Sequence, residues 1–169
     1  FSWKNEWPAG RTRAGALDVI RFSVDERDAA AYHKLDAAMA RGETLSAADE
    51  QTWIRNSVNC SSLYAHLREH GGEYDRILGG PYLFGVVYSA ALIHPDKTLL
   101  VPCLHDEPFA RLGIMKPLFE KARGCLFNTE PERDFAKSLF RIPEARRRVV
   151  GMGIESFDAD PGAFARRSG

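Results

Sequence analysis

Short apolar runs alternate with helix-like segments along the second half of the chain, between residues 74 and 153. The runs are apolar on both of their faces, whereas a half-exposed antiparallel strand would alternate apolar and polar residues. This pattern is typical of a parallel sheet that helices cover on both sides. The sequence therefore predicts a three-layer α/β domain with a mostly parallel sheet.

The boundaries of these elements follow from the apolar runs and from the turn residues between them. Strands are expected over residues 74–80, 97–104, 124–129 and 147–153. The expected helical segments are 81–93, an irregular stretch over 108–122, and 130–140. Pro81 stands where it would open the first of these helices at its N1 position.

The first half of the chain reads as mainly helical. An irregular opening over residues 1–15 precedes a strand over 16–24, and helices follow over 25–42, after Ser46, and over 58–72. Ser46 has N-cap character, because Asp49 three residues later gives a near capping box. The length suits one domain over residues 1–169, with 157–169 as an exit from it.

Composition narrows the classes of partner and compartment. Lys plus Arg equal Asp plus Glu at 23 each, which disfavours nucleic acid, because that binding depends on an excess of basic residues. No apolar run approaches the roughly 20 residues that cross a bilayer, and no signal peptide is readable, so a soluble domain is expected. Three cysteines without CxxC spacing indicate reduced thiols in a cytoplasmic setting rather than a zinc ribbon.

The loops after the strands are the expected place for a site, because in a parallel sheet they meet at one carboxyl edge, where ligands bind. These loops are residues 79–82, 105–108, 128–131 and 151–156. His105 could act there as a general base or bind a substrate hydroxyl, and a plain turn does not need an imidazole. Asp106 and Glu107 could share that role, although capping of the following helix is the preferred interpretation for each of them.

Glycines in two of the loops allow a second kind of contact. Gly79, Gly80 and Pro81, in the loop that also holds Tyr82, could let an anion approach backbone N–H groups at a helix N-terminus. A plain strand-to-helix turn explains the same glycines equally well. Gly151 and Gly153 pose the same choice in the last loop. The short motifs leave both interpretations open.

Two further patterns favour structural interpretations. Residues 66–70 match the H-x-x-E-H pattern of zinc proteases, but His70 is followed by two glycines and would lie in a fraying last turn, so no metal site is expected. The Arg146–Arg148 triplet is interpreted as a solvated strand entry. The alternative is an electrostatic contact with a membrane surface or a phosphorylated acceptor.

Four segments, taken in order, resemble the acceptor-side, N-terminal half of a retaining GT-B glycosyltransferase of the family 4 type. The segments are YDRILGGPY, TLLVPCLHDEP, ARGCLFNTEPERDF and RVVGMGIESFDADP, and the resemblance covers residues 75 to about 161. The resemblance implies one Rossmann-like lobe of a two-lobe enzyme. A donor-binding second lobe is not among these residues, so this half is expected to be inactive alone.

The resemblance also implies site residues. His105 matches the active-site histidine that contacts the transferred sugar, and Asn128, Thr129 and Glu130 match a loop lining the same cleft. Gly153 and Glu155 match the crossing toward the donor domain. The implied donor is a nucleotide sugar, the acceptor is a saccharide or glycoconjugate, and neither metal nor cofactor is expected.

Two other functions stay open. An α/β module of this fold could be a non-catalytic scaffold or a nucleotide sensor, because fold does not fix function. A hydrolase using His105 with Asp106 is a weaker reading, since the sequence has no G-x-S-x-G nucleophile elbow.

Overall fold

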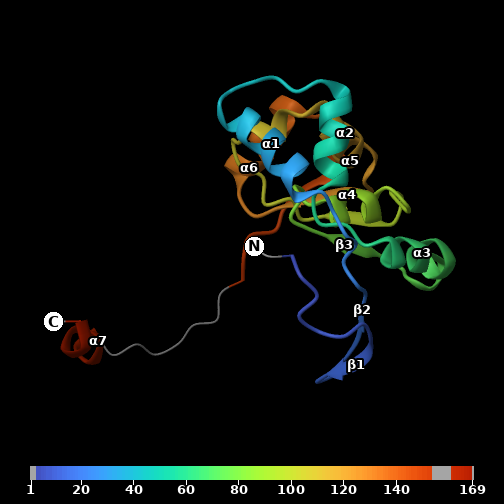
Figure 1. The fold of residues 1–169 in the computed structure, drawn as a ribbon. Helices are drawn as coiled ribbons and strands as arrows, with labels where there is room; N and C mark the ends of the chain where they lie inside the picture. The colour runs from blue at the N-terminus through green and yellow to red at the C-terminus, as the bar shows by residue number, and fades with distance from the viewer. Residues whose placement is uncertain (1–2, 154–160, 169) are drawn as a thin grey trace.

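The centre of the protein is a four-stranded parallel sheet in the order β3-β4-β5-β6. The computed structural model describes residues 3–153 and 161–168 (Figure 1). The strands are β3 (Ile77–Gly79), β4 (Thr98–Leu100), β5 (Gly124–Phe127) and β6 (Arg147–Val149). Helices flank the sheet, so the predicted α/β class is confirmed, and the fold is consistent with a Rossmann-like three-layer arrangement.

Helical segments connect the strands in turn. They are α4 (Gly85–Ala91), the 3-10 helices η2 (Pro108–Arg111) and η3 (Gly113–Met115), α5 (Lys116–Lys121), α6 (Glu130–Leu139) and the 3-10 helix η4 (Glu144–Arg146). Right-handed crossovers between neighbouring parallel strands place successive connections on the same face of the sheet. Leu100, Cys125 and Phe127 are fully buried in one cluster with Phe119 of α5 and Ala136 of α6. The main core therefore lies between the sheet and these helices.

The opposite face of the sheet is less covered by the described residues. Leu78 of β3 pairs in register with Leu99 of β4, and Leu99 lies opposite Gly124 of β5, so these positions share a face. Leu78 is 68% exposed, and Leu99 is half-buried. The sequence predicts helices on both faces of the sheet, without stating how completely each face is covered. The sequential strand order explains the difference between the two faces, because it sends the connections to one side.

Three helices of the first half match the predicted ones. They are α1 (Ala29–Ala40), α2 (Ala47–Arg55) and α3 (Ser61–His70), and a short 3-10 helix η1 (Gly71–Glu73) follows α3. Helices α1 and α2 contact each other and also η2 and η3, respectively, and Figure 1 shows them near α5 and α6 at the top of the view. Ser46 is the N-cap of α2, as predicted, and its hydroxyl oxygen accepts the N–H of Asp49 at 3.1 Å.

Acidic residues before α1 cap two different helices. The expected helix over 25–42 begins only at Ala29, because Asp28 caps it by accepting the N–H of Ala31 at 2.9 Å. The Asp25 carboxylate instead accepts the N–H of Ser61, at the first residue of α3, at 2.9 Å. Of these two carboxylates, that of Asp28 thus caps α1 itself, and that of Asp25 anchors the start of α3.

A β-hairpin occupies part of the opening that the sequence predicts to be irregular. Strand β1 (Gly10–Ala14) pairs antiparallel with β2 (Leu17–Arg21), which lies within the predicted strand 16–24. Gly15 has a φ of +59° in the two-residue turn, a conformation that suits tight hairpins. Figure 1 shows the hairpin standing away from the rest of the molecule. The Arg-Thr-Arg alternation of β1 lacks apolar residues, which is why no strand was predicted there.

The helix expected to begin at Pro81 begins later. Phe84 is the N-cap of α4, and Pro81 follows Gly80 through a cis peptide bond. The N–H of Tyr82 donates to the carbonyl of Pro102 at 3.1 Å, so Tyr82 is held against the segment that leaves β4. Residues 82–84 form a turn and a bend there, where the sequence predicted a first helical turn.

The last described element is α7 (Pro161–Ser168), within the stretch predicted to be an exit from the domain. No helix in the described part of the chain is both long and apolar enough to cross a bilayer.

Candidate functional site

A cavity of about 530 Å³ lies at the carboxyl ends of β4 and β5. The loop after β4 contributes His105 and Asp106, and the loop after β5 contributes Asn128 and Thr129. The remaining lining residues are Cys103, Leu104, Pro131, Glu132, Phe135 and Met152. The structure thus brings together two of the four predicted loops at the sheet edge, and Met152 adds a residue from the fourth.

Glu132 joins these two loops. Its side chain is only 8% exposed, and its two carboxylate oxygens accept the N–H of Leu104 at 2.8 Å and the N–H of Asn128 at 2.7 Å. The Thr129 hydroxyl oxygen caps α6 by accepting the N–H of Glu132 at 3.2 Å. We did not predict Glu132 from the sequence, although the T-x-x-E pattern of Thr129 and Glu132 is a capping box. Here the glutamate reaches past the N-cap to hold the neighbouring loop.

His105 is exposed at the cavity, and its imidazole makes no hydrogen bond to any of the described residues. The adjacent Asp106 carboxylate is engaged by the guanidinium of Arg111. A histidine acting as base for a nucleophile is normally oriented by a third group, often a carboxylate. The arrangement therefore leaves the imidazole free for a ligand and gives no support to a His105–Asp106 hydrolase pair.

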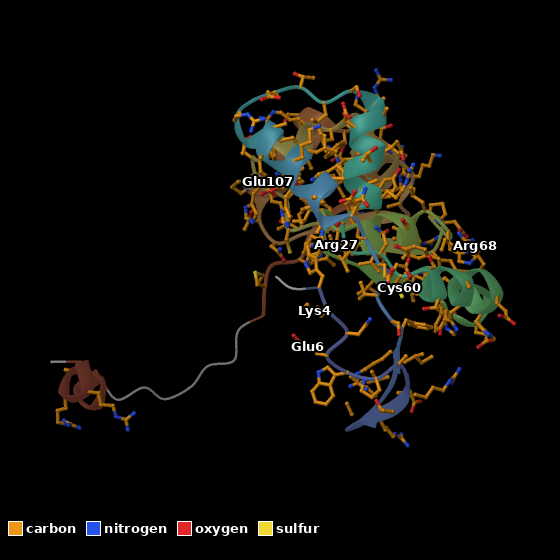
Figure 2. All side chains as sticks on the ribbon, in the orientation of Figure 1. Lys4, Glu6, Arg27, Cys60, Arg68 and Glu107 are labelled. Atoms are coloured by element: carbon orange, nitrogen blue, oxygen red, sulfur yellow. The ribbon has the colours of Figure 1, made fainter. Side chains whose placement is uncertain are left out.

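Glu107 and Tyr82 contact each other. The hydroxyl of Tyr82 donates to a carboxylate oxygen of Glu107 at 3.0 Å, and Tyr82 is fully buried (Figure 2 labels Glu107). Burial, reinforced by the Glu107 charge, raises the pKa of Tyr82. This bond ties the segment after β3 to the loop after β4. Neither residue lines the cavity, although both were predicted site residues.

Gly79 and Gly80 line a different cavity, of about 240 Å³, between α3, β3 and α4. A Cβ atom on Gly80 would lie 2.2 Å from the carbonyl oxygen of Val101, so glycine allows the close approach of two backbone segments there. This geometry agrees with the structural interpretation of the glycine turn.

Three further residues were predicted for the site, namely Glu130, Gly153 and Glu155, and none of them lines the cavity in the described part of the chain. Glu130 is exposed in the first turn of α6 and pairs with Arg133 at 3.9 Å. Gly153 is exposed at the end of the described segment, and Glu155 lies outside the described residues.

Cys103 is a feature of the cavity that we did not predict from the sequence. It lies in the cavity wall with a φ of +51°, a left-handed conformation that is uncommon outside glycine. The amide nitrogen of Asn128 donates to its sulfur at 3.6 Å. Strained backbone of this kind clusters at functional sites.

The histidines of the H-x-x-E-H pattern are engaged with other side chains. His66 Nε2 lies 2.7 Å from the Tyr74 hydroxyl, and His70 Nδ1 lies 2.8 Å from a Glu73 carboxylate oxygen. Among the described residues, no group of three or more His, Cys, Asp or Glu side chains is arranged to hold a metal ion.

Comparison with known proteins adds no family to this description, since no family model, curated protein or solved structure matches the chain. The fold and the cavity define an α/β domain with a mixed polar and apolar cleft at the carboxyl edge of a parallel sheet.

Proposed function

We propose that this chain is the acceptor-binding half of a nucleotide-sugar-dependent retaining glycosyltransferase that acts on a saccharide or glycoconjugate. The cavity at the carboxyl ends of β4 and β5 carries the proposal, because it gathers His105, Asn128 and Thr129 at the place where parallel sheets bind ligands. The resemblance of the sequence to the family 4 type supports the same function. The donor-binding domain is proposed to lie outside these 169 residues.

The side chains suit a sugar. Phe135 and Met152 give the cavity apolar surface, while Asn128 supplies an amide and Thr129 a hydroxyl, a combination typical of small-molecule sites. His105 would donate a hydrogen bond to the transferred sugar and stabilise charge developing in the transition state. The proposal calls for no metal or further cofactor.

A cytoplasmic location belongs to the same proposal. Cys60, Cys103 and Cys125 are all free thiols, which suits a reducing compartment.

The test is kinetic and uses the complete gene product with a panel of nucleotide sugars and saccharide acceptors. His105→Ala should lower kcat by about 100-fold with a smaller change in KM, because the lost contact acts mainly in the transition state. His33→Ala, at an exposed histidine of α1, is the matched control and should keep wild-type rates. A near-normal kcat for His105→Ala would remove His105 from the mechanism.

The less covered sheet face favours a second candidate, a non-catalytic α/β scaffold. Leu78 is 68% exposed there, and exposed apolar surface often marks an interaction site. Recovery of a defined partner protein, together with no sugar transfer by the complete gene product, would favour the scaffold.

A further inference from the structure

A second cavity, of about 430 Å³, lies between α6 and the edge strand β6 and is rich in positive charge. Its lining residues are Arg133, Lys137, Glu144, Arg147, Arg148 and Val149. Four of these six side chains are cationic and one is anionic. None of them lines the cavity of the proposed acceptor site, so the two sites can be tested separately.

Two of the cations are already paired with carboxylates. Arg133 Nε lies 3.0 Å from an Asp134 carboxylate oxygen, and Lys137 Nζ lies 3.6 Å from the same oxygen. One carboxylate therefore serves both side chains, with Glu130 a more distant partner of Arg133 at 3.9 Å. This leaves Lys137 only partly neutralised.

The other two cations have no carboxylate partner within the described part of the chain. Arg148 donates to two backbone carbonyl oxygens, those of Glu144 at 3.2 Å and Arg147 at 2.8 Å. Arg147 makes neither an ion pair nor a side-chain hydrogen bond with the described residues, and its Nε atom is buried without an acceptor. A buried donor without a partner is costly, and such a group in a folded protein calls for a bound ion or water.

From these contacts we infer that the cavity between α6 and β6 binds a phosphate monoester. The negative charge of a phosphate group would balance the excess positive charge of the cavity. Its oxygens can accept two parallel N–H bonds from one guanidinium group, a geometry that a lysine ammonium group does not offer. An acceptor oxygen within reach of Arg147 would satisfy the buried Nε–H. The cavity volume lies within the usual range for small-ligand sites.

The balanced charge of the whole chain restricts the ligand to a small group. Glu144 in the lining and Asp134 beside it would repel the continuous phosphate backbone of a nucleic acid, which needs an extended basic surface. The phosphate monoester could be that of a soluble metabolite or of an anionic lipid headgroup, because both present the same oxygens.

The test is an NMR titration of the 169-residue chain with inorganic phosphate and with glycerol 3-phosphate, at constant ionic strength set with chloride. Saturable shifts are expected at the Arg147 Nε–Hε signal and at the backbone of β6. Arg147→Gln and Lys137→Gln should each weaken binding at least fivefold. Arg147→Lys keeps the charge but loses the Nε–H and should also weaken it.

Arg141→Gln is the matched control, because it removes the same charge from an exposed position between α6 and η4 that does not line the cavity. Wild-type shifts that do not saturate, or equal weakening by Arg141→Gln, would overturn the inference. Lys137 lies on the exposed side of α6, so its variant keeps the test valid if Arg147→Gln does not fold.

A sedimentation assay distinguishes the two sources of the phosphate group. Vesicles of phosphatidylcholine with phosphatidic acid should bind the chain, and Arg147→Gln should abolish that binding, if the source is a lipid. Saturable binding of glycerol 3-phosphate without vesicle binding would assign the site to a soluble phosphate monoester.

Discussion

Single carboxylates hold the loops around the cavity in place. Glu132 accepts two backbone N–H groups from different loops, and Glu107 accepts the hydroxyl of the buried Tyr82. Hydrogen bonds to a charged acceptor are stronger than those between neutral groups. The shape of the cavity therefore depends on side chains that do not need to touch a ligand.

Replacing Glu132 with Gln should lower the free energy of unfolding by about 1–3 kcal/mol, because the amide keeps one acceptor oxygen and turns a donor toward the other buried N–H. Urea unfolding measures the loss, and faster hydrogen exchange at Leu104 and Asn128 would localise it. Glu130→Gln, at an exposed position of the same helix turn, is the control and should change stability little. Equal stability of the two variants would contradict the role given to Glu132.

The cavity residues that could be predicted from the sequence are those that follow the strands closely. His105 and Asn128 were predicted because strand ends meet at one edge, which is a property of the sheet alone. Glu132 was missed because its role depends on the distance between two loops, which no local pattern contains. The conformation of Cys103 is set in the same way by tertiary packing.

At the scale of elements, the connection between β3 and α4 depends on a close contact of two backbone segments. The N–H of Val101 donates to the carbonyl of Gly79 at 2.8 Å, and Gly80 faces the Val101 carbonyl with no room for a Cβ. The contact continues the β3–β4 pairing beyond the strands, so the helix begins only after Phe84.

Gly80→Ala should lower the free energy of unfolding by about 1–3 kcal/mol, because the new methyl group must displace the backbone of Val101. Gly72→Ala is the matched control, since a Cβ there meets nothing within 4 Å. Thermal and urea unfolding compare the two. A Gly80→Ala protein as stable as the control would show that the contact relaxes freely.

The elements themselves were predicted with uneven success. Ser46 marked the start of α2 because its capping signal is local, and Ala29–Ala40 and Ser61–His70 formed as predicted helices. The irregular opening over residues 1–15 and the helix start at Pro81 were wrong predictions, because contacts between distant backbone segments decide both of them. Local signals can favour helix at Pro81, but they cannot outweigh a partner strand that is distant in the sequence.

At the scale of the whole molecule, the core contains acids that stay protonated. Burial raises the pKa of the Cys125 thiol to about 12, and burial together with Asp36 raises the pKa of Tyr32 to about 12. In the unfolded chain a cysteine thiol ionises at about pH 8.5 and a tyrosine hydroxyl at about pH 10. Their contribution to stability is complete below those values and is lost as the pH rises toward about 12.

The free energy of unfolding should therefore fall with rising alkalinity above about pH 9, by up to about 1.4 kcal/mol per pH unit for each group. Urea unfolding at a series of pH values measures the slope. Cys125→Ala should flatten the first part of the decline, whereas Cys103→Ala keeps the buried thiol and should keep the slope. Stability that stays constant to about pH 11 would contradict this assignment.

The parallel sheet with flanking helices was predicted because apolar runs are a global pattern, but the exposure of Leu78 was not predicted. The strand order β3-β4-β5-β6 sends the connections to one face, and strand order is not encoded in any run by itself.

The hairpin that stands away from the body has an optical consequence. Trp7, which precedes β1, is 71% exposed with the Arg21 guanidinium 5.8 Å from its ring centre, whereas Trp53 is fully buried and stacked on Tyr32 and Phe109. The fluorescence of the protein therefore combines an emitter already in water, Trp7, with a shielded one, Trp53, and with the half-buried Trp3. A change in the emission of the buried Trp53 therefore follows unfolding of the core. Quenching of Trp7 by a dissolved ion follows the exposure of the segment next to the hairpin.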